Sequence, residues 1–182
     1  MELNGKHITV AGLGKTGQAL AYFLLRRGAA VTVSDSAPEN HLADIPVQLR
    51  QAGVSLELGK HSPGTFQQAD LIVLSPGVPH TIAPIEAARR AGVPVIGEIE
   101  LAARFITTPI VAVTGTNGKS TVTRLIGLML ERSGLSVFVG GNLGTPLISY
   151  ADGPQEADAV VAEISSFQLD TIVDFRPRVG VL

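Results

Sequence analysis

Short runs of β-branched and other apolar residues alternate with helix-length segments along the sequence, and this alternation restricts the possible fold more than any other feature. Alternating strands and helices are typical of parallel sheets whose strands are joined by crossover helices. The sequence therefore predicts the α/β class, with a Rossmann-like parallel-sheet domain over residues 1–98. Its five strands are expected within residues 7–12, 30–35, 56–59, 71–77 and 93–98.

A second α/β unit is predicted over residues 99–182. The segment after the run at 110–113 carries Val122, Leu125, Ile126 and Met129 at i, i+3, i+4 and i+7, which predicts an amphipathic helix. Few helical segments remain to cover a parallel sheet on both faces, and the last apolar run reaches Leu182. We therefore expect an incomplete P-loop-type α/β domain, and we expect the chain to be the N-terminal part of a longer protein. Further strands are expected at 136–140, 159–164 and 178–182.

The segment TGTNGKST at residues 114–121 lies between a predicted strand and a predicted helix. Phosphate oxygens need several donors at once, and a glycine-rich turn that runs into a helix supplies backbone N–H groups and the positive end of the helix dipole. Gly115 and Gly118 permit this close approach, Lys119 adds a cation, and Ser120 or Thr121 offers a hydroxyl to Mg²⁺ or phosphate. The segment predicts a triphosphate site of variant form, and a glycine-rich turn with an exposed lysine is the alternative.

The segment GLGKTG at residues 12–17 has the spacing of a dinucleotide-binding turn, and Asp35 closes the next predicted strand. One interpretation is an NAD-binding Rossmann oxidoreductase. The same turn could instead bind another diphosphate, or simply pack a helix against a strand. The segment SPGV at 75–78 follows a later strand at the carboxyl edge of the sheet, where it could contact a ligand or form an ordinary Pro-Gly turn.

Several polar residues follow predicted strands of the second unit. Glu163 ends one such strand, and a single carboxylate there suits Mg²⁺, which needs only one or two protein oxygens. Without the phosphate loop, Glu163 would be interpreted as an exposed strand-end glutamate. Asn142, Ser165 and Gln168 are neutral hydrogen-bonding groups that could otherwise form turns. The four histidines are interpreted as surface or loop residues without a ligand role: His7, His41, His61 and His80.

Composition excludes several functional classes. The chain has 14 basic and 16 acidic residues, so no strong attraction to nucleic acid or to an anionic membrane is expected. It has no cysteine, which excludes disulfides and thiolate metal sites. Apolar runs stay far below the roughly 20 residues that span a bilayer, and the N-terminus lacks a signal-peptide pattern. We expect a cytoplasmic protein without membrane insertion.

The segments GLGKTG, SPGV, VTGTNGKST, GGNLG and AEISSFQL, in this order, resemble the Mur ligase family over the whole chain. The pairing of ISSFQL with a GLGxTG first domain is similar to the members that add D-glutamate. The resemblance implies an enzyme of peptidoglycan synthesis, an ADP-forming acid–amino-acid ligase that works through an acyl phosphate. It also implies UDP-N-acetylmuramoyl-L-alanine and D-glutamate as substrates, ATP and Mg²⁺ as cofactors, and a monomer.

Residue roles also follow from the resemblance alone. Lys119 and Glu163 would be catalytic. The C-terminal part of the family's active site would lie after Leu182, so we expect this stretch to be inactive by itself. Another Mur or folylpolyglutamate-type ligase and a non-catalytic nucleotide-binding stub remain alternatives. The implied uridine-nucleotide contacts are Lys15, Thr16, Asp35, Ser36, Ser75 and Gly77. The implied muramoyl-side contacts are Asn142, Ser165 and Gln168. The implied ATP contacts are Gly115, Thr116, Asn117, Gly118, Lys119, Ser120 and Thr121, and the implied Mg²⁺ ligands are Ser120 and Glu163.

Overall fold

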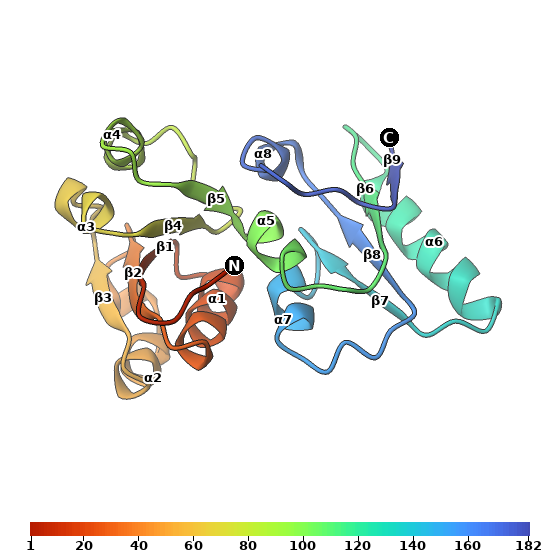
Figure 1. Ribbon diagram of the computed structural model, residues 1–182, viewed down its shortest axis with the longest axis horizontal. Helices are drawn as coiled ribbons and strands as arrows, with labels where there is room; N and C mark the ends of the chain where they lie inside the picture. The colour runs from red at the N-terminus through yellow and green to blue at the C-terminus, as the bar shows by residue number, and fades with distance from the viewer. The chain divides into compact units, whose positions relative to one another are not determined.

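The computed structural model describes residues 1–182, which separate into two compact units, Met1–Glu98 and Ile99–Leu182 (Figure 1). Each unit contains one sheet in which every pair of neighbouring strands is parallel. The predicted α/β class is therefore confirmed in both units.

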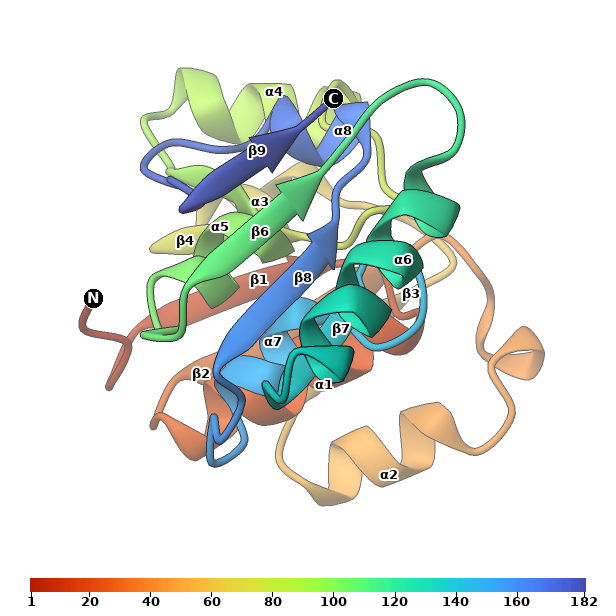
Figure 2. The same ribbon diagram turned by 90° about the vertical axis from the view of Figure 1, so that its right-hand side faces the viewer.

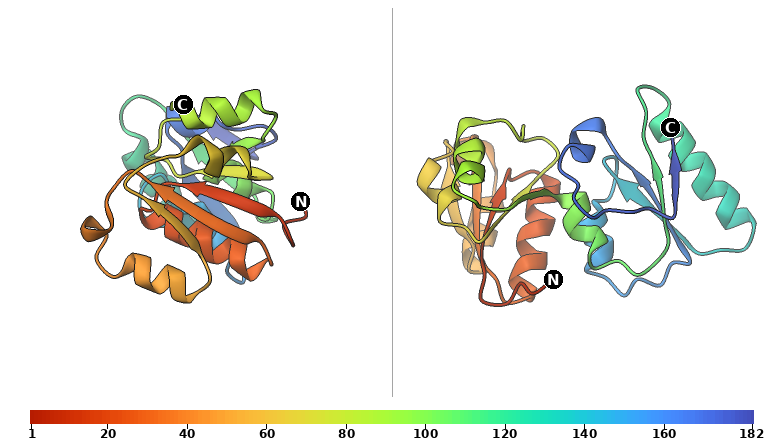
Figure 3. Two further views of the ribbon diagram at one scale, coloured as in Figure 1. Left: turned by 90° about the vertical axis from the view of Figure 1, so that its left-hand side faces the viewer. Right: turned by 45° about the horizontal axis from the view of Figure 1, so that its top comes forward.

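The first unit has a five-stranded sheet in the order β3-β2-β1-β4-β5. Its strands are β1 (His7–Ala11), β2 (Ala30–Asp35), β3 (Ser55–Leu58), β4 (Leu71–Leu74) and β5 (Val95–Gly97). Helix α1 lies on one face of the sheet, and α3 and α4 lie on the other (Figure 3). The core consists of buried apolar side chains from both layers, such as Val10, Phe23 and Phe66. The helical elements are α1 (Lys15–Arg26), η1 (Glu39–His41), α2 (Ile45–Gln51), α3 (Pro63–Gln67) and α4 (Ala83–Arg90).

The turn between β1 and α1 brings the helix very close to the strand. A methyl group at Gly17 would lie 1.9 Å from the carbonyl oxygen of Gly12, so only glycine fits there. Gly12 itself has a φ of 93° and lies against Ser75 and Val78. Because the strand order reverses between β1 and β4, this turn stands at the switch point where open α/β sheets bind ligands.

The second unit has a four-stranded sheet in the order β7-β8-β6-β9. Its strands are β6 (Ile110–Val113), β7 (Val137–Gly141), β8 (Ala159–Glu163) and β9 (Val179–Val181). Helix α6 covers one face of this sheet and α7 lies on the other (Figure 2). The helices are α5 (Glu98–Ala103), α6 (Lys119–Arg132), α7 (Leu147–Ala151) and α8 (Ser166–Leu169).

Helix α6 uses only part of its predicted apolar stripe, because Val122 and Ile126 are half-buried but the other two residues are not. Its buried residues are Thr123 and Gly127, whereas Leu125 and Met129 are 52% and 68% exposed. The physical reason is close approach: a methyl group at Gly127 would lie 2.6 Å from a side-chain carbon of Val139. None of the helices combines the length and apolar character needed to cross a membrane.

We expect Gly17→Ala to destabilise the first unit, because the added methyl group collides with backbone that cannot easily move. Overpacking of this kind costs about 1–3 kcal/mol, more than the gain in helix propensity. The free energy of unfolding, measured by urea titration, checks this. Gly14→Ala is the matched control, since a methyl group there meets nothing within 4 Å. Equal stability of the two variants would contradict the close approach.

Candidate functional site

The loop between β6 and α6 is built to present backbone N–H groups at a helix start. Gly118 is the N-cap residue of α6 and has a φ of 80°, and Gly115 has a φ of 131°. Both conformations favour glycine. The Lys119 ammonium donates to the carbonyl oxygens of Gly115 at 2.8 Å and Thr116 at 3.2 Å. The loop therefore holds this cation at its own centre, while Asn117 and other loop residues stay exposed.

The Glu163 carboxylate connects the loop with two neighbouring strands. Pairing places Glu163 of β8 level with Val113 of β6 and with Gly141 of β7. The residue is 3% exposed. Its Oε2 accepts a hydrogen bond from the Ser120 hydroxyl at 2.7 Å, and its Oε1 accepts one from Asn142 Nδ2 at 3.0 Å. Two residues from separate segments, Ser120 and Asn142, thus converge on the buried Glu163 carboxylate.

A cavity of about 390 Å³ adjoins this pair and is lined by both Ser120 and Glu163. Thr123 also lines it, and its buried hydroxyl has no hydrogen-bond partner. Hard oxygen donors at the mouth of a phosphate loop fit Mg²⁺, which keeps several waters and needs few protein ligands. No group of three or more His, Cys, Asp or Glu side chains is placed to hold a metal ion.

In the first unit, the predicted nucleotide-binding residues lie at the carboxyl edge of the sheet. Asp35 Oδ2 accepts from the Leu13 N–H at 2.5 Å and its Oδ1 accepts from the Ala37 N–H at 2.7 Å, so this carboxylate joins two loops. Ser75 is buried and donates to the Gly12 carbonyl at 3.3 Å. Lys15 and Thr16 begin α1, while Ser36 and Gly77 are exposed.

Ser165 and Gln168 bond to each other rather than pointing separately from the sheet. They form a capping box at the start of α8, in which the Ser165 hydroxyl accepts from the Gln168 N–H and the Gln168 side chain accepts from the Ser165 N–H. Gln168 is 4% exposed, and its buried side-chain Nε2 has no partner. The sequence indicated these residues by motif, but not that they cap a helix of four residues.

Comparison with known families decides where this arrangement belongs. Residues 6–97 match the model of the Mur ligase MurD-like N-terminal domain, and residues 113–182 match that of the Mur ligase middle domain. The chain belongs to the Mur ligase family. The whole chain is 61% identical to the UDP-N-acetylmuramoylalanine–D-glutamate ligase of Desulfatibacillum aliphaticivorans and 58% identical to that of Desulfosudis oleivorans. It spans 40% of the length of these relatives.

Solved structures agree with the fold of this Mur ligase chain. A pseudomurein peptide ligase type C from Methanothermus fervidus matches 89% of the chain and 33% of its own length, with a TM-score of 0.51 and 29% identity. A UDP-N-acetylmuramate:L-alanyl-gamma-D-glutamyl-meso-diaminopimelate ligase from Neisseria meningitides matches 98% of the chain and 60% of its own length, with a TM-score of 0.56 and 22% identity. The second likeness concerns the fold alone.

The Mur ligase chain also contains a polar cluster that sequence reasoning missed, around Ser34, the residue before Asp35 in β2. The Ser34 hydroxyl donates to Glu57 Oε2 at 2.8 Å and lies 2.8 Å from His61 Nδ1. Glu57 accepts further bonds from the Ser62 N–H and the Thr65 hydroxyl. His61 lies in a loop, as predicted, but its ring is half-buried and contacts Ser34. The only signal for this cluster in the sequence is the group of polar residues within 57–65, because Ser34 meets Glu57 only through the pairing of β2 with β3.

Glu57 is expected to make the stability of the first unit depend on pH. Burial alone would raise the pKa of the Glu57 carboxyl, but hydrogen bonds from Ser62, Ser34 and Thr65 outweigh burial and lower that pKa. A lowered folded-state pKa stabilises the fold above the unfolded-state pKa of about 4.3, and this contribution is lost as the pH falls through the folded-state value.

We expect Glu57→Gln to lower the free energy of unfolding by about 1–3 kcal/mol at pH 7, because charge-assisted hydrogen bonds are weakened. The difference from the unsubstituted chain should shrink between pH 5 and pH 3, as urea titrations at each pH would show. Glu2→Gln serves as the control, because Glu2 is an exposed carboxylate of the same unit. A stability difference that stays constant over this pH range would contradict the role given to Glu57.

Proposed function

We propose that this chain supplies the uridine-nucleotide site and the phosphate loop of a ligase that joins D-glutamate to UDP-N-acetylmuramoyl-L-alanine in peptidoglycan synthesis. The substrates come from the names of relatives that are 50–61% identical over the whole chain. The activity would consume ATP with Mg²⁺, take place in the cytoplasm and be carried out by a monomer. Residues 1–98 would hold the UDP-linked substrate, and residues 99–182 would hold ATP.

The observation that carries this proposal is the convergence of Ser120 and Asn142 on the buried Glu163 carboxylate, with Lys119 next to Ser120 in the chain. A lysine and a serine hydroxyl at a helix start, next to a strand-end carboxylate, suit phosphoryl transfer, which needs positioning and charge neutralisation. The Glu163 carboxylate is fixed on two sides by hydrogen bonds of 2.7 and 3.0 Å. It is therefore pre-organised before any ligand arrives.

The proposed chemistry assigns a separate task to each group. A carboxylate is a poor electrophile, so the alanyl carboxylate of the substrate would take the γ-phosphoryl group from ATP, releasing ADP, and the D-glutamate amine would then displace phosphate. Gly115 to Thr121 would hold the triphosphate through backbone N–H groups. Lys119 would neutralise charge on the transferred phosphoryl group. Ser120 and Glu163 would hold Mg²⁺, which supplies Lewis-acid charge stabilisation when bound.

Asn142, Ser165 and Gln168 are proposed for the muramoyl side of the substrate, and their contacts give them different roles there. Asn142 is exposed and contacts Glu163, so it could reach a substrate and also orient the carboxylate. Gln168 is buried in the capping box, so it would act by shaping the start of α8. Direct contact with substrate would then fall to Ser165, which is half-buried, or to Asn142.

An NAD-binding oxidoreductase is the second candidate, and it rests on the turn at 12–17 and on Asp35.

A binding experiment separates the two candidates. We expect UDP-N-acetylmuramoyl-L-alanine to bind the chain in isothermal titration and to be displaced by UDP. Asp35→Asn should weaken this binding about 10-fold, because an amide oxygen cannot replace two carboxylate oxygens on the Leu13 and Ala37 N–H groups.

The control for this titration is Asp44→Asn, since the Asp44 side chain makes no capping bond at α2. Binding of the muramoyl nucleotide should be the same in this variant as in the unsubstituted chain. Binding of NADH that UDP does not displace, without binding of the muramoyl nucleotide, would refute the ligase proposal in favour of the oxidoreductase.

A second test concerns Glu163 in a ligase polypeptide that contains this chain at the full length of its relatives. We expect Glu163→Gln to lower turnover about 100-fold or more, because the metal and phosphoryl charges lose their anionic partner. Binding of the muramoyl nucleotide should change little. The exposed carboxylate change Glu156→Gln is the control. Turnover that survives in the Glu163→Gln variant would exclude a role for Glu163 in the reaction.

A further inference from the structure

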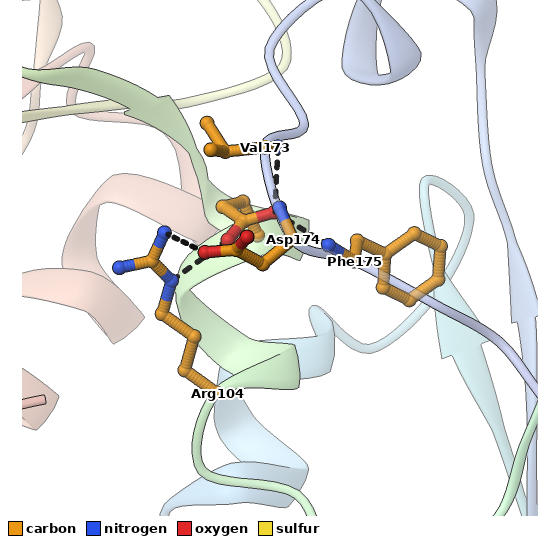
Figure 4. A network of polar contacts seen from close by, with 5 residues as sticks. Arg104, Val173, Asp174 and Phe175 are labelled. Atoms are coloured by element: carbon orange, nitrogen blue, oxygen red, sulfur yellow. Dashed lines mark hydrogen bonds and ion pairs between the residues drawn. The ribbon is translucent and has the colours of Figure 1, made fainter.

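Glu100 of α5 is a buried carboxylate that lies outside the phosphate-loop site. Its side chain is fully buried. Its Oε2 accepts hydrogen bonds from three consecutive backbone N–H groups, those of Val173 at 2.9 Å, Asp174 at 3.0 Å and Phe175 at 2.9 Å (Figure 4). Its Oε1 accepts from Arg104 Nε at 2.7 Å. We call Glu100 with residues 173–175 the carboxylate clamp.

In the carboxylate clamp, the three backbone N–H groups donate to a charged oxygen, and such hydrogen bonds are stronger than those to a neutral acceptor. Three successive N–H groups that converge on one point form a concavity suited to an anion, and here the protein fills it with its own side chain. Burial alone would raise the pKa of the Glu100 carboxyl, but the bonds from Val173, Arg104, Asp174 and Phe175 outweigh burial and lower it. Arg104 also donates to the Asp174 carboxylate at 3.2 Å, which ties the same segment a second time.

The clamped segment connects two parts of the proposed site. On its N-terminal side is α8, whose capping box contains Ser165 and Gln168. On its C-terminal side is β9, which pairs with β6, and the carbonyl of Val181 accepts from the N–H of Thr114 at 2.9 Å, where the phosphate loop begins. Residues 173–175 therefore fix the path of the backbone between the candidate muramoyl side and the strand pair beside the loop.

Helix α8 needs such external support. It has four residues, and a helix this short has too few internal hydrogen bonds to be stable by itself. Its start is fixed by the capping box, and the Thr171 hydroxyl donates to the Gln168 carbonyl at 3.0 Å near its end. Beyond Thr171, the Ile172 N–H still bonds back to the Leu169 carbonyl, and the Val173 N–H is the first group to reach the Glu100 carboxylate.

We propose that Glu100 is a positioning residue for the ligase reaction, acting through residues 173–175 to hold α8 and its capping box in place for the muramoyl side of the substrate. This inference rests on the proposed function. The hydrogen bonds of Glu100 go to Arg104 and residues 173–175, so its influence would reach the reaction through the backbone of the second unit. Loss of the clamp should affect the muramoyl substrate before it affects ATP.

The test is Glu100→Gln in the ligase polypeptide of full family length, assayed for phosphate release. Glutamine keeps the shape but loses the charge that orders three N–H groups. We expect KM for UDP-N-acetylmuramoyl-L-alanine to rise about 10-fold to 100-fold, while KM for ATP stays within about 2-fold. Amide hydrogen exchange at residues 173–175 and at α8 should accelerate in the same variant. Asp170→Asn, an exposed carboxylate change at the end of α8, is the control.

Two outcomes would overturn the role of Glu100 while leaving the proposed function intact. One is unchanged kinetics in a folded Glu100→Gln variant. The other is a fall in kcat that follows the loss of folded protein, with both KM values unchanged. If Glu100→Gln does not fold, Arg104→Gln is the second variant, because it removes one hydrogen bond to the Glu100 carboxylate and leaves the three backbone bonds. It should raise KM for the muramoyl substrate and leave KM for ATP unchanged. Unchanged KM values in this variant would also refute the role. An unsubstituted polypeptide without ligase turnover would instead refute the proposed function itself.

Discussion

The registration of three strand ends in the second unit is the constraint on which the proposed site depends. Val113, Glu163 and Gly141 lie level with one another, so the phosphate loop, the acidic residue and the turn that carries Asn142 all emerge at one edge. Gly141 makes this possible, because a side chain there would lie 2.4 Å from the carbonyl oxygen of Glu163. A shift of one residue would turn the Glu163 carboxylate to the opposite face of the sheet.

In the first unit, too, a glycine that allows close approach shapes the carboxyl edge of the sheet, here for the proposed uridine site. Its glycine turn stands where the strand order reverses, and Gly17 lets α1 approach the strand closely enough for the turn to face the sheet edge. Asp35 spans the turn and the loop after β2 with two N–H bonds, and the Glu57 cluster supports the strand from the other face. Close backbone approach at the glycine turn and the hydrogen bonds of the Asp35 and Glu57 carboxylates together support the proposed uridine site.

Local sequence patterns predicted the strands well, and long-range partnerships poorly. Each predicted apolar run overlaps an observed strand, although β3 and β7 are shifted by one residue, because buried parallel strands are short and apolar. The apolar stripe predicted the buried face of α6 only in part, since Val122 and Ile126 are half-buried but the close approach of Gly127 to Val139 had no local signal. The partnership of Glu100 with Val173 joins residues 73 positions apart, and no local pattern reports it. The motifs indicated the loop and Glu163, but not the Asn142 contact.

Hydrogen-bond capacity separates the three principal carboxylates of the chain by role. A carboxylate can accept about four hydrogen bonds. Glu100 accepts from three backbone N–H groups and Arg104, and Glu57 accepts from Ser34, Ser62 and Thr65, so protein donors nearly saturate both. Glu163 is as deeply buried as a core residue, yet it accepts only from Ser120 and Asn142. A buried charge with open lone pairs is costly unless a cation completes its surroundings. This imbalance supports Glu163, among the three, as the carboxylate that a metal-bound triphosphate would satisfy.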